Sequence, residues 1–219
     1  ARLEHPNIIS VYDVGVNEDL EPYFTMDVKS GDSLENVVQN VSYSINERLN
    51  IFLKVCDAIA YAHSKNVIHL DLKPDNIQVG KYGEVIICDW GVSKLIGDDE
   101  KESDEEFDPD TANNLTLHGK IKGTPGYMAP EQISGEEKDA TTEIYALGCI
   151  LYALLTSKRP FNGDTETVLR KTLLGQIDTP VNQNREIDQS LSSVTMKALS
   201  LRSEDRYQSV NELAQEINK

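Results

Sequence analysis

Three polar side chains in the middle of the chain have the types and spacing to bind a metal ion and to accept a proton. Asp71 and Asn76 lie five residues apart, and Asp89 follows thirteen residues after Asn76. Pro74 excludes a continuous helix between the first two, so this stretch is expected to be a loop. Residues 77–88 are expected to form a strand, a turn and a second strand. Such a hairpin would bring the three side chains together at the ends of short elements.

The elements that must position these groups are predicted to be a few strands followed mostly by helices. Ser44 and Glu47 form a capping box at the start of a long amphipathic helix, and His63 lies on its apolar stripe as a packed core histidine. The longest apolar run, residues 144–155, is too short to span a bilayer and indicates a buried helix. The expected strands are 8–14, 22–26, 77–79 and 85–88, and the expected helices are 33–38, 49–63, 142–156, 165–174, 191–201 and 210–217.

Charge excludes some classes of partner. The chain has 219 residues, a formal net charge of −16 and a pI near 4.6, which argues against nucleic acid or an anionic membrane as the main partner. Residues 98–110 hold nine carboxylates and one lysine. Residues 93–123 around them show no sustained period, so a mobile loop is expected there.

The cysteines and the first residues bear on the setting of the chain. Cys56, Cys88 and Cys149 lie far apart in apolar runs, which favours buried thiols in a reducing compartment and a cytoplasmic location. The chain starts at Ala1 with neither an initiator methionine nor a signal peptide, so we expect it to be cut from something longer. No membrane span is expected within it.

Three motifs around the polar groups resemble those of Ser/Thr protein kinases. His-Leu-Asp-Leu-Lys-Pro-Asp-Asn at 69–76 is similar to the catalytic loop, Asp-Trp-Gly at 89–91 to the metal-binding turn, and Ala-Pro-Glu at 129–131 to the end of the activation segment. The resemblance covers the whole chain and implies an α+β, protein-kinase-like fold. Its implied divisions are a remnant of the β-rich N-lobe and hinge start at 1–28, a mostly helical C-lobe at 29–219, an activation segment at 89–131 and an acidic insert at 98–110.

The resemblance also implies roles for the polar groups. Asp71 would orient the substrate hydroxyl and accept its proton, and Lys73 would place a cation on the transferring phosphoryl group. Asp89 and Asn76 would hold Mg²⁺. Thr124 resembles the activation-segment threonine that contacts the catalytic aspartate and lysine.

Residues that would bind ATP follow from the same resemblance. Met26 falls at the gatekeeper position, and Asp27, Val28 and Lys29 form the hinge whose backbone would bind adenine. Gln78 lies where an apolar residue usually forms the floor of the adenine pocket. The alternative for residues 22–26 is a plain half-buried strand.

Other positions concern the support of the site. Leu70 stands where most kinases carry the arginine that receives an activation-loop phosphate, and Trp90 replaces a phenylalanine. Glu143 stands where an aspartate usually binds the catalytic-loop backbone, and its extra methylene would shift that loop. Glu131 would form a buried ion pair with Arg206.

The function implied is a bacterial Ser/Thr protein kinase in its full-length form, with ATP, Mg²⁺ and a Ser/Thr-containing protein as partners. The Gly-rich loop, the third-strand lysine and the αC glutamate are expected to precede Ala1. We therefore expect residues 1–219 alone to be inactive and to expose apolar surface. A pseudokinase or scaffold that binds partners without catalysis is the alternative.

The acidic insert has two interpretations. It is either a solvated segment without a role, or it selects basic substrates or inhibits the kinase until a partner relieves it. Ser103, Thr111 and Thr116 are candidate autophosphorylation sites.

Overall fold

Two long helices form the centre of the molecule in the computed structural model. They are α2 (Ile45–Ser64) and α4 (Ala140–Thr156). Helix α2 begins at the predicted capping box, in which Ser44 Oγ accepts from the Glu47 amide and the Glu47 carboxylate accepts from the Ser44 amide. The structure describes residues 3–18, 20–28, 31–40, 42–96 and 123–219.

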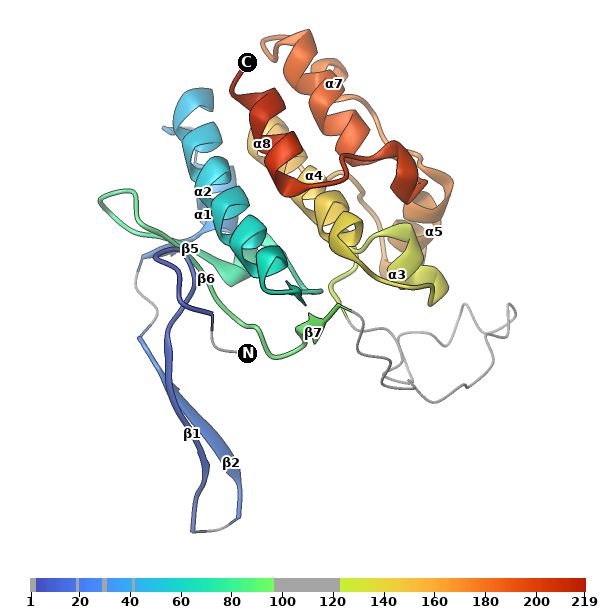
Figure 1. Ribbon diagram of the computed structural model, residues 1–219. Coiled ribbons are helices and arrows are strands. Elements are labelled where there is room, and N and C mark those ends of the chain that lie inside the picture. The colour runs from blue at the N-terminus through green and yellow to red at the C-terminus, as the bar shows by residue number, and fades with distance from the viewer. Residues whose placement is uncertain (1–2, 19, 29–30, 41, 97–122) are drawn as a thin grey trace.

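Helix α4 is the core helix that the apolar run predicted. All residues from Thr141 to Leu155 are buried, which is the signature of a helix covered on every side. Helices α2 and α7 (Gln189–Ala198) pack against it, and α8 (Val210–Ile217) packs against α2 (Figure 1). These four helices therefore form one continuous helical body.

The remaining helices are short or lie at the edge of this body. Helix α5 has its predicted bounds, whereas α7 begins and ends earlier than expected, because Asp188 caps its first turn and Leu199 ends it. Helices α3 and α6 were not predicted: each begins at a proline and is too short to show a period. Their bounds are α1 (Leu34–Gln39), α3 (Pro130–Ser134), α5 (Thr165–Leu174) and α6 (Pro180–Gln183), with 3₁₀ turns η1 (Pro74–Asn76) and η3 (Ser203–Asp205).

The strands form small antiparallel sheets, so that the fold is α+β. The predicted hairpin after residues 69–76 is present, with β5 and β6 joined in register from Ile77 opposite Ile87 to Val79 opposite Val85. The strands are β1 (Val11–Val16), β2 (Pro22–Met26), β3 (Asp32–Ser33), β4 (Val67–Ile68), β5 (Ile77–Val79), β6 (Val85–Ile87) and β7 (Lys94–Leu95).

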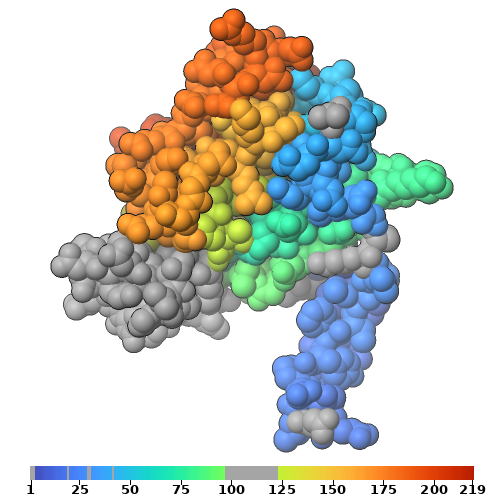
Figure 2. Space-filling view, turned by 180° about the vertical axis from the view of Figure 1, so that it is seen from behind, coloured from blue at the N-terminus to red at the C-terminus, as the bar shows by residue number. Residues whose placement is uncertain are grey.

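Hairpin β1–β2 projects away from the helical body, as both views show (Figures 1 and 2). Apolar side chains on it are exposed, among them Val14 at 73% and Phe24 at 61%. The expectation that this part of the chain exposes apolar surface is confirmed.

The strand expected over residues 8–14 is wrong at its start. Ile8 forms an isolated parallel bridge with Ile87, and the Ile9 amide donates to the Ile87 carbonyl at 3.0 Å. Residues 7–9 therefore pair with the β5–β6 sheet, and strand β1 begins later, where the chain turns to pair with β2.

The loop expected over residues 93–123 is partly replaced by a strand. Strand β7 pairs with β4, with Val67 opposite Leu95. Lys29, which was predicted to belong to the hinge, lies outside the described residues, as do the acidic run 98–110 and the predicted phosphorylation sites Ser103, Thr111 and Thr116. No helix within the described ranges is long and apolar enough to cross a membrane.

Candidate active site

The backbone after β4 is held by a carboxylate from the core helix α4. Glu143 is 1% exposed, and its Oε1 accepts from the His69 amide at 2.6 Å and from the Leu70 amide at 3.0 Å. A carboxylate with two charge-assisted bonds to consecutive amides fixes the path of the chain. The glutamate thus holds the catalytic loop directly, in spite of its extra methylene.

The other oxygen of Glu143 binds a histidine of α2. Oε2 lies 2.6 Å from His63 Nε2. Burial raises the pKa of the Glu143 carboxyl, but the His63 bond, the charges of His63 and His69 and the Leu70 amide together lower it below its ordinary value. His63 is largely buried as expected, and its pairing with Glu143 was not predicted because the partners are 80 residues apart.

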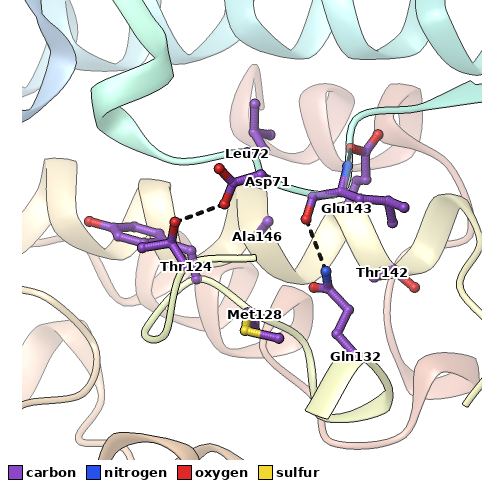
Figure 3. A pocket seen from close by; sticks show the side chains of 10 residues that line it. Asp71, Leu72, Thr124, Met128, Gln132, Thr142, Glu143 and Ala146 are labelled. Atoms are coloured by element: carbon purple, nitrogen blue, oxygen red, sulfur yellow. Dashed lines mark hydrogen bonds between the residues drawn. The ribbon is translucent and has the colours of Figure 1, made fainter. Parts of the chain in front are cut away.

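Asp71, Lys73 and Thr124 form a closed triangle of hydrogen bonds. Lys73 Nζ donates to Asp71 Oδ2 at 2.8 Å and to Thr124 Oγ1 at 2.6 Å, and Thr124 Oγ1 donates to Asp71 Oδ1 at 2.8 Å. Figure 3 shows the bond between the threonine and the aspartate. The predicted contacts of Thr124 with both residues are confirmed.

Asn76 and Asp89 are brought to neighbouring stretches of backbone. The Asn76 carbonyl accepts from the Cys88 amide at 2.8 Å, and Asp89 is the next residue. The Asn76 amide nitrogen donates to the Asp71 carbonyl at 2.9 Å, which leaves its amide oxygen as the available ligand. Asp89 has a left-handed backbone, with φ of 63°, and its exposed carboxylate forms no hydrogen bond within the part of the chain described.

One carboxylate and one amide oxygen form a sparse ligand set. Among the described residues, no group of three or more His, Cys, Asp or Glu side chains could hold a metal ion. Mg²⁺ is commonly bound by one or two carboxylates with water and substrate phosphates completing its coordination. The donors of Asn76 and Asp89 fit that ion, and they do not form an all-protein cage.

The turn at Asp89 is packed onto the catalytic loop. The ring centroids of His69 and Trp90 lie 4.6 Å apart, and His69 Nε2 is 3.0 Å from the Cys88 carbonyl. Trp90 Nε1 donates to the Ile87 carbonyl at 3.3 Å. Trp90, which replaces the phenylalanine usual in kinases, therefore packs between the turn at Asp89 and the loop that contains His69.

The residues predicted to bind adenine are not gathered with this triangle. Met26 ends β2 at 37% exposure, Val28 is 92% exposed, and Asp27 accepts from the Tyr12 hydroxyl at 2.6 Å. Gln78 lies on β5, partly exposed, and donates to the Asp75 carbonyl at 3.5 Å. Their nucleotide-binding roles stay predictions.

A shallow depression beside Asp71 contains residues that the sequence did not point to (Figure 3). Tyr127 is 4% exposed, and its hydroxyl has no hydrogen-bond partner among the described residues; burial raises its pKa. Gln132 is 8% exposed and donates to the Leu70 carbonyl at 3.0 Å. The only sequence signal for Gln132 was its position three residues after Ala129, where a capping side chain is common.

The predicted ion pair between Glu131 and Arg206 is confirmed. Arg206 donates to both carboxylate oxygens, at 2.6 and 2.8 Å, in a buried position. This two-point contact ties the end of the activation segment to the loop before α8.

A mostly helical body that carries an Asp-Lys-Asn loop, followed by an Asp-Trp-Gly turn, defines the protein kinase class. Comparison with known proteins agrees with this, since residues 1–217 match the protein kinase domain family. The chain therefore belongs to the protein kinase family.

Its relatives include bacterial proteins named serine/threonine-protein kinase PknD. The Protochlamydia amoebophila protein is 39% identical over 236 residues, which cover 99% of this chain and 24% of the relative. The Chlamydia trachomatis serovar L2b protein is 38% identical over 239 residues, and the Chlamydia caviae protein is 36% identical over 239, each with 25% of the relative covered. The chain thus spans about a quarter of the length of these relatives.

Proposed function

We propose that this chain is the catalytic part of a Ser/Thr protein kinase that transfers the γ-phosphate of ATP to a protein hydroxyl. The observation that carries the proposal is the triangle of Asp71, Lys73 and Thr124, in which both carboxylate oxygens of Asp71 are held. A carboxylate fixed in this way can orient a hydroxyl and accept its proton without having to reorganise.

In the proposed reaction the substrate hydroxyl oxygen bonds to the γ-phosphorus while the bond between this phosphorus and the β,γ-bridging oxygen breaks. The hydroxyl proton goes to Asp71, and ADP is the leaving group. Lys73 would balance negative charge on the transferring group, since its ammonium lies 2.8 Å from the Asp71 carboxylate that accepts the proton. Thr124 holds Asp71 and Lys73 in register.

Two separate sets of residues would hold the metal ion and the nucleotide. Asp89 and the amide oxygen of Asn76 would bind Mg²⁺, which when bound neutralises charge on the phosphate oxygens. Met26, the backbone of Asp27 to Lys29, and Gln78 would contact adenine. The proposed division into an N-lobe part at 1–28 and a C-lobe at 29–219 follows the same assignment.

The position before Asp71 affects how the kinase would be controlled. Leu70 carries no charge, so this residue cannot receive a phosphate from the activation segment. We infer that order in this part of the site is supplied instead by buried side chains that bind the Leu70 backbone, Glu143 at its amide and Gln132 at its carbonyl.

Substrate choice and location are inferred from charge and from thiol burial. A net charge of −16 favours substrates with basic residues around the acceptor hydroxyl. Cys56 and Cys149 are fully buried free thiols, in keeping with a reducing, cytoplasmic setting. Neutralising the carboxylates of 98–110 tests the substrate preference, and equal rates on basic and acidic peptides before and after the change would contradict it.

The test of the proposed activity is γ-phosphate transfer by the full-length protein to a protein or peptide substrate. Asp71→Asn and Asp89→Ala should each abolish most transfer, whereas Asp57→Asn, an exposed carboxylate on α2, should leave it intact. Wild-type transfer that is unchanged by both site variants would contradict the assignment of these residues.

The alternative is a module that binds partners without catalysis. The exposed apolar side chains of hairpin β1–β2 are the observation in its favour. Full-length protein that shows no transfer under any metal or nucleotide condition would favour this alternative. Residues 1–219 alone are proposed to be inactive, because they do not include the Gly-rich loop, the third-strand lysine or the αC glutamate that hold the ATP phosphates in protein kinases.

A further inference from the structure

The residue before Asp71 has a backbone conformation that L-amino acids with side chains rarely adopt. Leu70 has φ of 66°, in the left-handed region. Its psi and peptide planes set the direction in which the next side chain, Asp71, leaves the chain. Something other than local preference must therefore hold Leu70 in this conformation.

Both backbone polar groups of Leu70 are bound by side chains from other elements. Its amide donates to Glu143 of α4 at 3.0 Å, and its carbonyl accepts from Gln132 of α3 at 3.0 Å. Figure 3 shows the side chain of Gln132 reaching up to the loop, to the right of the bond between Thr124 and Asp71. Leu70 is thus held by a hydrogen bond at each of its two peptide groups.

Gln132 is itself fixed at its other end. Its Oε1 accepts from the Ala129 amide at 2.9 Å, and the side chain is buried. One amide side chain therefore joins the first turn of α3, where the activation segment ends, to the catalytic loop. Both of its polar atoms are used, and no charge is involved.

We propose that Gln132 is a positioning residue that, together with Glu143, holds Leu70 in its left-handed conformation and so aims Asp71 at the substrate hydroxyl. This inference rests on the proposed kinase function. In this proposal the hydrogen bond from Gln132 to the Leu70 carbonyl couples the activation segment to the catalytic loop. That bond involves no charge, and Leu70 itself has no charge with which to bind a phosphate.

The chain offers variants that separate the two bonds of Gln132. Gln132→Glu keeps an acceptor for the Ala129 amide but has no donor for the Leu70 carbonyl at neutral pH. Gln132→Met keeps the size and loses both bonds. Ile133→Val, a neighbouring buried residue on α3 without a polar group, is the matched control.

In the full-length protein, Gln132→Glu and Gln132→Met should lower kcat roughly tenfold to a hundredfold, the size expected for a misplaced catalytic group. The KM for ATP should stay within about twofold, since the adenine-binding residues are elsewhere, and Ile133→Val should change neither. Leu70→Gly in the Gln132→Met background should recover part of kcat, because glycine adopts positive φ without strain. A purely structural role for Gln132 predicts no such recovery.

Amide hydrogen exchange gives a readout that does not need activity. Loss of the hydrogen bond from Gln132 to Leu70 should speed amide exchange in the segment 69–73 of both Gln132 variants, relative to wild type and Ile133→Val, while α2 stays protected. Unchanged exchange in that segment would overturn the inference, as would unchanged kcat in an active enzyme. If the wild-type protein showed no phosphate transfer but the Gln132 variants exchanged faster, the kinase function would be contradicted. The role of Gln132 in holding Leu70 would still be supported.

Discussion

Arg206 binds both carboxylate oxygens of Glu131, and the arginine side chain has no exposed surface. The same guanidinium donates to the Thr141, Ser200 and Leu201 carbonyls. All of its hydrogen-bonding capacity is spent on three separate stretches of chain, which makes it the joint between the activation segment and the C-terminal helices.

Removing that joint should destabilise the fold strongly. Arg206→Ala leaves Glu131 buried without its counter-charge, so the free energy of unfolding should fall by about 3–5 kcal/mol. Chemical denaturation followed by circular dichroism measures it. Arg202→Ala, which breaks the exposed contact of Arg202 with Glu204, is the control and should change stability little. Similar losses for the two arginines would contradict this reading of the pair.

Glu143 should make stability depend on acid pH. Its pKa is lowered in the folded state, so the folded protein binds its proton less readily than the unfolded chain does. The stabilisation is therefore present above the unfolded-state pKa, about 4.3, and is lost as pH falls through the lower folded pKa.

Glu143→Gln tests this dependence, because the amide keeps an acceptor for the His69 and Leu70 amides but cannot titrate. Its unfolding free energy should fall less than that of wild type as pH drops below about 4.3. Glu137→Gln, an exposed carboxylate, is the control. Parallel curves for wild type and Glu143→Gln would show that Glu143 does not carry the effect.

Thr124 should matter through its hydroxyl alone. Thr124→Val keeps the shape and removes the bonds to Asp71 and Lys73, so kcat for phosphate transfer should fall at least tenfold, as for a disturbed acid–base group. Thr124→Ser retains the hydroxyl and should recover most of the rate. A serine variant as slow as the valine variant would argue that the methyl group is what counts.

The N-cap of α8 gives a test of the fold itself. Ser209 Oγ accepts from the Glu212 amide at 3.2 Å, and Ser209→Ala should cost about 1 kcal/mol of stability. Ser193→Ala, in the middle of the exposed face of α7, removes a hydroxyl that only binds the preceding turn and should be near neutral. Thermal denaturation of the two variants compares them directly.

Local patterns predicted those elements whose signals are contained within a few residues. The capping box at Ser44 and the apolar run of α4 correctly predicted the two central helices. Residues 77–88 were correctly predicted as a hairpin, and the fold class followed from motif order. The prediction that a strand begins at Ile8 was wrong, because Ile8 pairs with Ile87, which is 79 residues away in the sequence. A local pattern cannot indicate so distant a partner.

The sequence by itself determined the candidates for the chemistry: type and spacing pointed to Asp71, Asn76 and Asp89, and the resemblance to protein kinases added Lys73. Tertiary structure alone decided how they are held. His63 with Glu143, and Gln132 with Leu70, pair across 80 and 62 residues of chain. Such contacts arise only when packing of α2, α3 and α4 brings buried polar groups together, where each must find a partner or lose its hydration uncompensated.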